Sequence, residues 1–483
     1  MFLSLPFWGK GLPYKEAGAG VGFTRRGGST SRWYRSKYKE PILDMLGAAT
    51  ILKSEGHDIQ VYDAQFYKTK DFDDFFNHLK TYEKPEMALI RTSLPTLNND
   101  IRIVEQLKRR WPDTIYAVFG PCFYSDYVVD YVKYRKTFDL IIVSEIETVI
   151  GDVYEKKSHC DAPGVYRKIG GDYIISNPTR LMSDLEKIPP LDYSLIDYPK
   201  LERFFLQTSK GCPVSCKFCP YYLSQGSKFR VKSITRAVDE VKTVVSNFGA
   251  KRILFRDPNF AFLHQRTHEF CKALLKQPIK FEWHCETDLH RLRPDDLELM
   301  SQAGCTRIAF GVESANLMGI KNKMHGKPPQ VDILKEDIKA CKALGIETRA
   351  MYILGIKGDS LGNILETIKL SMELKADISA FGLPNFYPGS NLFNDALKAG
   401  RIPILKPFNE EAIGYFDAIS NQSEPPLIYV EGLEIEDLKL LRDLGFYTNL
   451  VRISRMASKL KKMVKKYRIK KRLKKRLSFP IDV

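Results

Sequence analysis

The chain has 483 residues, of which 44% are hydrophobic, and its mean hydropathy is −0.27. This length predicts roughly two or three domains, and the composition is typical of a globular protein with sizeable cores. No run of about 18 apolar residues is present, so no membrane-spanning helix is predicted.

The net charge of +17 gathers at the C-terminus, because fourteen Lys or Arg and no Asp or Glu fall between Arg452 and Leu477. Apolar side chains recur there at helical spacing, at Leu460, Met463, Val464 and Tyr467. This pattern predicts a helix on an anionic membrane surface, where each cation contributes on the order of 1 kcal/mol. Nucleic acid as the partner and a disordered, solvated charge run are the two alternatives.

Nine cysteines and the N-terminal sequence bear on the cellular compartment. The segment MFLSLPFWGKGLPYKE has no basic residues before its apolar run, so it predicts a first strand and not a signal peptide. A cytoplasmic protein is therefore expected, associated peripherally with the inner face of the membrane if the tail binds there. Buried free thiols are expected at the six scattered cysteines: Cys122, Cys160, Cys271, Cys285, Cys305 and Cys341.

Strands and helices alternate through the first 150 residues. Strands are predicted over 2–7, 57–63, 87–90, 115–119 and 139–143, and helices over 42–55, 72–82, 99–111 and 126–134. Such alternation predicts a doubly wound, Rossmann-like α/β domain, with ligands beyond the carboxyl ends of its parallel strands. The Gly- and Arg-containing segment 9–40 is interpreted as a mobile loop, with an anion cradle as the alternative.

A second alternating region follows a connector. Residues 151–203 predict that connector, with a hairpin at Gly170–Gly171. Strands are then predicted over 204–207, 252–256, 280–284, 307–310, 348–353 and 379–383, and helices over 235–247, 265–275, 294–303, 330–344 and 361–374. Six such units are too few for a closed eight-stranded barrel, so they predict an open, partial (β/α) barrel. The expected division is 1–150, 151–203, 204–400, a helical cap over 401–450 and the basic tail 451–483.

Three cysteines stand together in KGCPVSCKFCPYY, where Cys212, Cys216 and Cys219 form a C-x3-C-x2-C array after the first barrel strand. Three thiolates on one loop ligate three irons of an iron–sulfur cluster and leave the fourth iron open. A zinc site needs a closed fourth ligand, and no CxxC or HxxxH follows nearby. A disulfide needs an oxidising compartment, of which the sequence gives no sign. The array therefore predicts a 4Fe–4S cluster.

Residues 212–219, with Phe218 directly before the third cysteine, resemble the signature loop of the radical SAM superfamily. The resemblance implies that the open iron binds S-adenosylmethionine (SAM). It also implies that an electron, from a reductant such as flavodoxin or ferredoxin, cleaves SAM to a 5′-deoxyadenosyl radical. That radical abstracts hydrogen from an unactivated carbon of a small-molecule substrate, while the protein orients the bond and excludes water.

Residues at the ends of the later predicted strands also resemble segments of the radical SAM superfamily. Asp257 resembles the acceptor for the SAM amino group, with a helix N-cap or turn residue as its alternative. The segment of Gly311, Glu313 and Ser314 resembles the family's ribose-contacting segment, where a structural ion pair is the alternative role of Glu313. Gly355 begins a segment similar to the one near the adenine, with Lys in place of the usual Pro two residues on. The segment 386–390 is close to the P-Y-P-G-T of cobalamin-type members.

The first 150 residues resemble the cobalamin-binding domain attached to many radical SAM enzymes, through Ser93, Gly120 and the segment 144–148 among others. The D-x-H-x-x-G motif of the axial histidine is replaced by the Gly/Arg loop, and Pro121 stands where a second glycine is common. The resemblance implies cobalamin without a protein histidine on cobalt. Family members that keep the fold and bind no cobalamin are the alternative.

The combined likeness implies cobalamin-dependent C-methylation of a hydrophobic or lipid-like substrate, as in hopanoid methylases. The alternative is an oxidative cyclase or rearrangement enzyme, resembling the anaerobic porphyrin-ring cyclase, that uses cobalamin differently or not at all. A tRNA methylthiotransferase is disfavoured, because the N-terminal domain carries only Cys122 where that family has three cluster cysteines. A membrane-associated scaffold without catalysis is favoured only if the cluster is absent.

Overall fold

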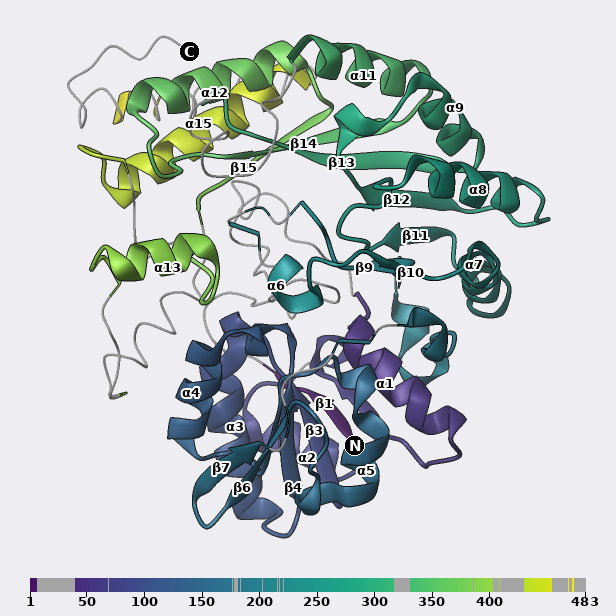
Figure 1. Cartoon of the computed structure of the whole chain (residues 1–483), viewed down its shortest axis with the longest axis vertical. Coiled ribbons are helices and arrows are strands. Elements are labelled where there is room, and N and C mark those ends of the chain that lie inside the picture. The colour runs from purple at the N-terminus through teal and green to yellow at the C-terminus, as the bar shows by residue number, and fades with distance from the viewer. Residues whose placement is uncertain are drawn as a thin grey trace.

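The computed structural model places two α/β parts one above the other, with the N-terminal part at the bottom of Figure 1. The structure describes residues 1–6, 40–175 except 68, 181–316 except 183, 202, 215, 217 and 220, 331–402 except 385, and 430–453. It also describes the isolated positions 177, 408, 468, 471 and 472. The segment 9–40, apart from residue 40, and nearly all of the basic tail beyond residue 453 lie outside this part of the chain.

The first sheet has seven strands, in the order β2-β1-β3-β4-β5-β6-β7. Its strands are β1 Phe2–Ser4, β2 Val61–Asp63, β3 Met87–Arg91, β4 Ile115–Phe119, β5 Leu140–Ile142, β6 Val165–Ile169 and β7 Asp172–Ile175. The pairings among β1 to β5 are parallel, as predicted. The hairpin at Gly170–Gly171 is confirmed, but it is not a free connector: β6 pairs antiparallel with β5 and extends the first sheet.

Helices cover both faces of this sheet. They are α1 Leu43–Ser54, α2 Phe72–Leu79, α3 Leu97–Arg110, α4 Asp126–Arg135 and α5 Ile150–Lys156. Alternate strand residues enter different cores: Leu89 packs in one with α1 and α5, and Ile90 packs in the other with α2, α3 and α4. Side chains alternate across a strand, so a sheet covered on both faces needs apolar residues at successive positions. All five residues of β3 are accordingly buried.

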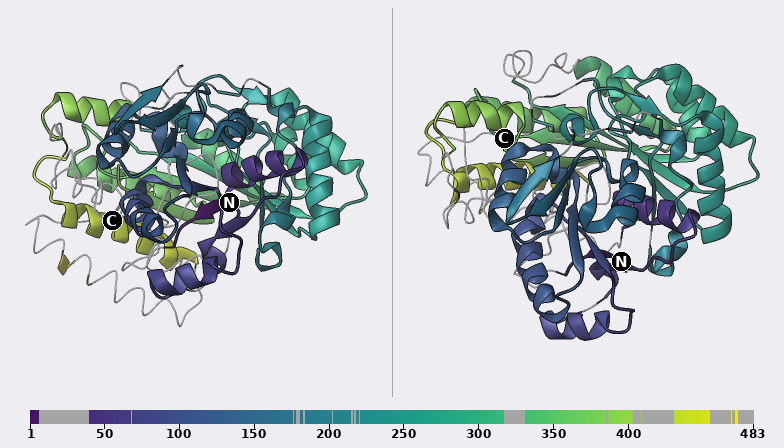
Figure 2. Two further views of the ribbon diagram at one scale, coloured as in Figure 1. Left: turned by 90° about the horizontal axis from the view of Figure 1, so that it is seen from below. Right: turned by 60° about the horizontal axis from the view of Figure 1, so that its bottom comes forward.

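The second sheet has six parallel strands, in the order β8-β11-β12-β13-β14-β15, as the sequence predicts. They are β8 Phe204–Leu206, β11 Arg252–Phe255, β12 Glu282–Glu286, β13 Cys305–Glu313, β14 Glu347–Ile353 and β15 Ile378–Gly382. The intervening helices are α7 Ile234–Phe248, α8 His264–Leu275, α9 Pro294–Gln302, α11 Val331–Ala343 and α12 Leu361–Leu374. Each packs on the next and together they form one outer layer, which Figures 1 and 2 show from three sides.

Several short elements were not predicted. They are the strand pair β9 Ser209–Lys210 and β10 Arg230–Val231, the helices α6 Tyr221–Gln225 and α13 Asn391–Lys398, and the short helices η3 Pro121–Tyr124, η4 Ile146–Thr148 and η9 Leu289–Arg291. The helix α15 Ile435–Ile453 continues beyond the predicted 434–444 and packs on β15 and α12. Among the helices of the described residues, none is long and apolar enough to span a membrane.

His284 in β12 makes the stability of the protein depend on pH. Burial, and next the charge of Arg307, lower the pKa of His284 to about 3. An unfolded histidine has a pKa near 6.5, so the unfolded state binds more protons as the pH falls below that value. We expect His284 to reduce the free energy of unfolding between about pH 6.5 and 3, by at most about 1.4 kcal/mol per pH unit.

The measurement is the urea midpoint against pH for the wild type and for His284→Gln, which should lose this part of the acid slope. His159→Asn is the matched control because His159 is exposed in η5 Lys157–His159. Its curve should follow the wild type throughout. Parallel curves for His284→Gln and the wild type would contradict a buried neutral imidazole.

Candidate active site

The cysteine loop begins at a tightly closed turn between β9 and β10. Gly211 has a φ of +82°, and a Cβ there would lie 2.1 Å from the Lys228 carbonyl oxygen. The Cys212 N–H donates to the Gly226 carbonyl over 3.1 Å. Only glycine fits such a close approach of two backbones, so the residue before the first cysteine fixes where the loop leaves the sheet.

The three cysteines of the loop lie together, as their spacing predicts. Burial raises the pKa of the Cys216 thiol to about 12, and Glu313 and Cys212 raise it further by their charges. Burial likewise raises the pKa of Cys219, whose neighbours include Cys216 and Cys212. Thiols this close suit a cluster, and iron must displace their protons to bind. The six other cysteines are buried and free, as predicted.

Phe218 of this loop meets the loop that follows β14. Its ring packs on buried Ile356, next to Gly355. The N–H groups of Gly355 and Ile356 both donate to the Asp359 carboxylate over 3.0 Å. The carboxylate therefore shapes the segment predicted to lie near the adenine, and the structure brings that segment to the cysteine loop.

Glu313 is the last residue of β13, has a strained backbone conformation, and places its carboxylate beside Gly311. Its φ is +66°, and the register with β14 shifts between the two residues. A Cβ on Gly311 would lie 2.2 Å from the Glu313 carboxylate, so the glycine leaves room for it. Such local strain is common at binding sites. Burial, and next the charge of Asp288, raise the pKa of Glu313 to about 8.

These contacts bear on the predicted ribose role. Glu313 forms no ion pair with another described residue, and the residues 317–330 that follow this segment lie outside the described part of the chain. The ribose contact and the structural ion pair therefore both stay predictions for Glu313. Ser314 is fully buried, and its Oγ lies 3.3 Å from the Thr367 hydroxyl. Ser314 therefore holds the loop after β13 to α12. Contact of Glu313 or Ser314 with SAM stays a prediction.

Asp257 is buried against Thr208 and Ser209, the residues that precede the cysteine loop in the chain. It accepts hydrogen bonds from the Thr208 N–H at 2.8 Å, the Thr208 hydroxyl at 2.6 Å and the Ser209 hydroxyl at 2.7 Å. Its side chain is buried, and α8 begins later with Leu263 as its N-cap, so Asp257 is not a helix cap. These bonds favour a positioning role at the strand end that carries the cysteines, while the predicted contact with the SAM amino group stays a prediction.

Ser93 and Gly120 come together at the carboxyl ends of β3 and β4. Gly120 has a φ of +150°, and a Cβ there would lie 2.2 Å from the Thr92 carbonyl oxygen. The Ser93 hydroxyl lies 3.2 Å from that of Thr96. Both residues shape the loops at this edge of the sheet, and their predicted contact with cobalamin stays a prediction.

The carboxyl edges of the two sheets face each other. Helix α6, directly after the cysteine loop, contacts η3, which directly follows Gly120, and α6 lies between the two parts in Figure 1. A Cβ on Gly389, after β15, would lie 3.3 Å from the Ser125 Cβ at the end of η3. The carboxyl edge of the first sheet, where doubly wound domains generally bind ligands, therefore adjoins the mouth of the second sheet.

Four charged residues join the two parts at this edge, and sequence reasoning missed their pairing. Arg230 donates to both Glu145 oxygens over 2.9 Å, and Lys210 lies 3.0 Å from Glu147. Burial opposes ionisation of Glu145, but Lys210 and Arg230 outweigh it and hold its pKa below the ordinary value. The only signal in the sequence was the resemblance of 144–148 to a cobalamin-domain segment.

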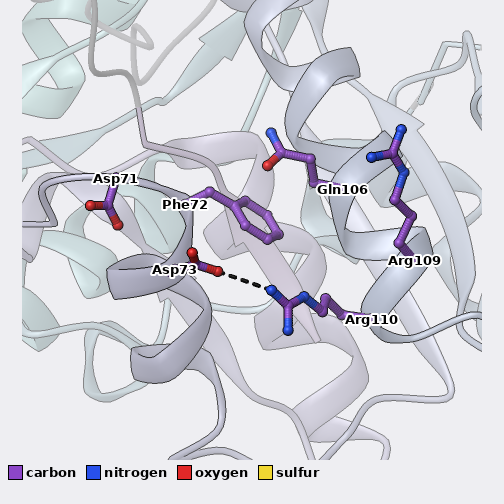
Figure 3. Close-up of a pocket in the computed structure, with 6 residues that line it drawn as sticks. All are labelled: Asp71, Phe72, Asp73, Gln106, Arg109 and Arg110. Carbon is purple, nitrogen blue, oxygen red and sulfur yellow. Dashed lines mark hydrogen bonds and ion pairs between the residues drawn. The ribbon is translucent and has the colours of Figure 1, made fainter.

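A separate surface pocket lies between α2 and α3, away from these loops (Figure 3). Arg110, paired with Asp73 at 3.1 Å, closes one side of it. Arg110 ends α3 just before β4 begins, which places the pocket toward the amino edge of the sheet, opposite Gly120. It contains none of the predicted site residues.

Comparison with known proteins identifies the second part. Residues 206–371 match the model of the radical SAM superfamily. An uncharacterised methyltransferase of Pyrococcus horikoshii is 22% identical over 366 residues, covering 74% of this chain and 78% of that protein. The anaerobic magnesium-protoporphyrin IX monomethyl ester cyclase of Rubrivivax gelatinosus is 23% identical over 65% of this chain, which spans only 58% of the cyclase.

A solved structure shares the fold of most of the chain. The radical S-adenosylmethionine methyltransferase TsrM of Kitasatospora setae, determined with cobalamin and a 4Fe–4S cluster bound, has a TM-score of 0.63. The match covers 74% of this chain and 75% of TsrM at 14% identity. With the cysteine loop at the mouth of a six-stranded parallel sheet, residues 206–371 are a radical SAM domain, which binds a 4Fe–4S cluster and SAM, and the chain is a radical SAM enzyme.

Proposed function

We propose that this enzyme transfers a methyl group from cobalamin to an unactivated carbon of a hydrophobic or lipid-like substrate. The observation that carries the proposal is the contact of α6 with η3, since it sets the cysteine loop against the edge of the first sheet where a cobalamin would lie. When bound, the cluster and SAM would supply a radical that removes hydrogen from carbon, and cobalamin would supply the methyl group.

The residues of the chain have distinct roles in this proposal. Cys212, Cys216 and Cys219 hold the cluster, and Glu313 accepts hydrogen bonds from SAM. Phe218 packs on Ile356 and so holds the cysteine loop against the segment predicted to lie near the adenine. A reductant must supply the electron, so the cysteine loop must be reachable for electron transfer from outside.

Cobalamin in this chain would bind without a histidine on cobalt. The first 203 residues contain three histidines: His57, His78 and His159. Among the described elements, each follows or ends a helix, whereas the ligand edge is formed by loops that follow strands. The absence of the D-x-H-x-x-G motif agrees with this arrangement.

The second candidate is an oxidative cyclase, which the similarity to the Rubrivivax enzyme over 65% of this chain supports. A cyclase would couple the substrate radical within the substrate and would need no methyl group. The two candidates therefore differ in their use of cobalamin.

Cobalamin retention tests the proposal. Protein reconstituted anaerobically with iron and sulfide is incubated with hydroxocobalamin, passed through a desalting column and read by its visible absorbance. We expect about one cobalamin per chain and, after reduction, an electron paramagnetic resonance spectrum without coupling to a protein nitrogen. The variant with alanine at Cys212, Cys216 and Cys219 should keep cobalamin and lose iron, because the two ligands bind to different parts of the chain. Loss of cobalamin from the wild type would favour the cyclase.

Binding to anionic liposomes tests the lipid-like substrate and the tail together. Removal of residues 455–483 should abolish binding if the basic tail anchors the enzyme. If the truncated and full-length proteins bind the liposomes equally, the tail is not a membrane anchor.

A further inference from the structure

Two histidines and two aspartates meet where α8 and α9 begin. His264 is the first residue of α8, and His268 follows one helical turn later, with the ring centroids 4.5 Å apart. Asp295 and Asp296 lie in the first turn of α9, and the two helices pack side by side on the outer layer (Figure 1). The sequence therefore does contain an H-x3-H pattern, but its partners are aspartates and not the cluster cysteines.

The donor atoms of these four residues converge. One Asp296 oxygen lies 2.6 Å from His264 Nδ1 and 2.7 Å from His268 Nε2. An Asp295 oxygen lies 3.7 Å from the same His268 nitrogen. A nitrogen from each histidine and an oxygen of Asp295 all fall within 4.8 Å of one another. Separations of 2.6 and 2.7 Å are those of ion pairs or hydrogen bonds. A tetrahedral ion with bonds of about 2.0–2.1 Å would hold the same atoms about 3.3 Å apart, so small side-chain movements would let them share one ion.

The orientation of two of these atoms points to a ligand. His268 Nε2 and Asp296 Oδ1 are both buried and, despite their separation of 2.7 Å, neither forms a hydrogen bond with a described residue. The second Asp296 oxygen is already used, because it accepts from the Arg293 N–H over 2.8 Å and is hydrogen-bonded to His264 Nδ1 at 2.8 Å. The two atoms attract each other by charge, but neither is satisfied by a hydrogen bond, and a buried polar atom without one is costly, so a bound ion would stabilise this cluster.

We propose that His264, His268, Asp295 and Asp296 bind a divalent transition-metal ion of the zinc class. Imidazole nitrogen and carboxylate oxygen are ligands that zinc accepts in tetrahedral sites. The side chain of Asp295 is 61% exposed and that of Asp296 is 1% exposed, so the ion would have one side open to solvent and one side in the protein.

The place of this site in the fold indicates a structural role. Helix α8 follows the loop of Asp257 and Asn259, and α9 follows the loop of Thr287 and Asp288. Inside the barrel, the Thr287 hydroxyl donates to the Asn259 side chain over 2.8 Å. An ion outside would join the same two loops a second time, and would fix the position of the strand ends beside the cysteine loop. This role does not depend on the methyl transfer proposed for the enzyme.

Zinc binding to untagged protein tests the proposal, in a background with alanine at Cys212, Cys216 and Cys219 so that the cluster loop takes no metal. Equilibrium dialysis should give about one zinc per chain, Co²⁺ should give visible d–d absorption bands, and added zinc should raise the Tm. His268→Ala should lower the affinity by more than the roughly 10–100-fold that loss of an outer-shell partner costs.

Two further variants keep the result unambiguous. Asp295→Asn removes an exposed donor and should weaken zinc binding without unfolding the protein. His159→Ala changes an exposed histidine far along the chain and should bind zinc like its parent. If His268→Ala and Asp295→Asn bind zinc like the parent protein, or if the parent binds none, the four residues form only a hydrogen-bonded cluster and the proposal is wrong.

Discussion

Cys216→Ala is expected to lose the cluster and all reductive cleavage of SAM. Three thiolates hold three irons of such a cluster, and this chain offers no spare cysteine in its loop. Reconstituted wild-type protein should contain about four irons per chain, and the variant close to none. Iron and sulfide analysis, the visible absorbance of the cluster and 5′-deoxyadenosine formation under dithionite measure the effect.

Cys341→Ala is the matched control. Cys341 is a free, buried cysteine of α11 in the core of the second part. Its replacement should cost on the order of 1 kcal/mol of stability by leaving a small cavity, and should keep the iron. If Cys216→Ala keeps both its iron and SAM cleavage, Cys216 is not a ligand of the cluster and the prediction is wrong.

Arg230→Ala is expected to destabilise the protein by about 3–5 kcal/mol, which is the usual cost of breaking a buried ion pair. The side chains of Arg230 and Glu145 are only 4% and 6% exposed. Without the guanidinium, the Glu145 carboxylate stays buried with Lys210 as its remaining cation, at 3.9 Å. The midpoint of urea unfolding measures the loss.

Two comparisons show whether burial is the cause. Arg252→Ala removes an arginine paired with Glu282 at 2.9 Å, where the side chains are 45% and 50% exposed, and should cost at most about 1 kcal/mol. The double variant Arg230→Met with Glu145→Leu removes both buried charges and should recover much of the loss. Equal effects of Arg230→Ala and Arg252→Ala would contradict a buried junction between the two parts.

The same pair responds to acid. Because the pKa of Glu145 is held below its ordinary value in the folded state, its contribution to stability is present above about pH 4.3. That contribution is lost as the pH falls through the lower, folded-state pKa. The unfolding midpoint of the wild type should therefore approach that of Arg230→Ala in strong acid.

The sequence by itself determined the features that depend on local spacing. The predicted cluster ligands Cys212, Cys216 and Cys219 lie on one loop with only five other residues between them, so local spacing alone indicates an iron–sulfur cluster. The six strands of the second sheet followed from alternating apolar and helical patterns, since each strand and helix buries a face of its own.

Only the tertiary structure decided the contacts between segments far apart in the chain. It tied Asp257 to the strand before the cysteines, joined Arg230 to Glu145, and set His264 and His268 beside the aspartates of the next helix. It also added the hairpin of β6 and β7 to the first sheet. Residue type and spacing show which chemical groups a segment carries. The residue that each group contacts depends on how strands and helices far apart in the chain pack together, and no local pattern in the sequence carries that information.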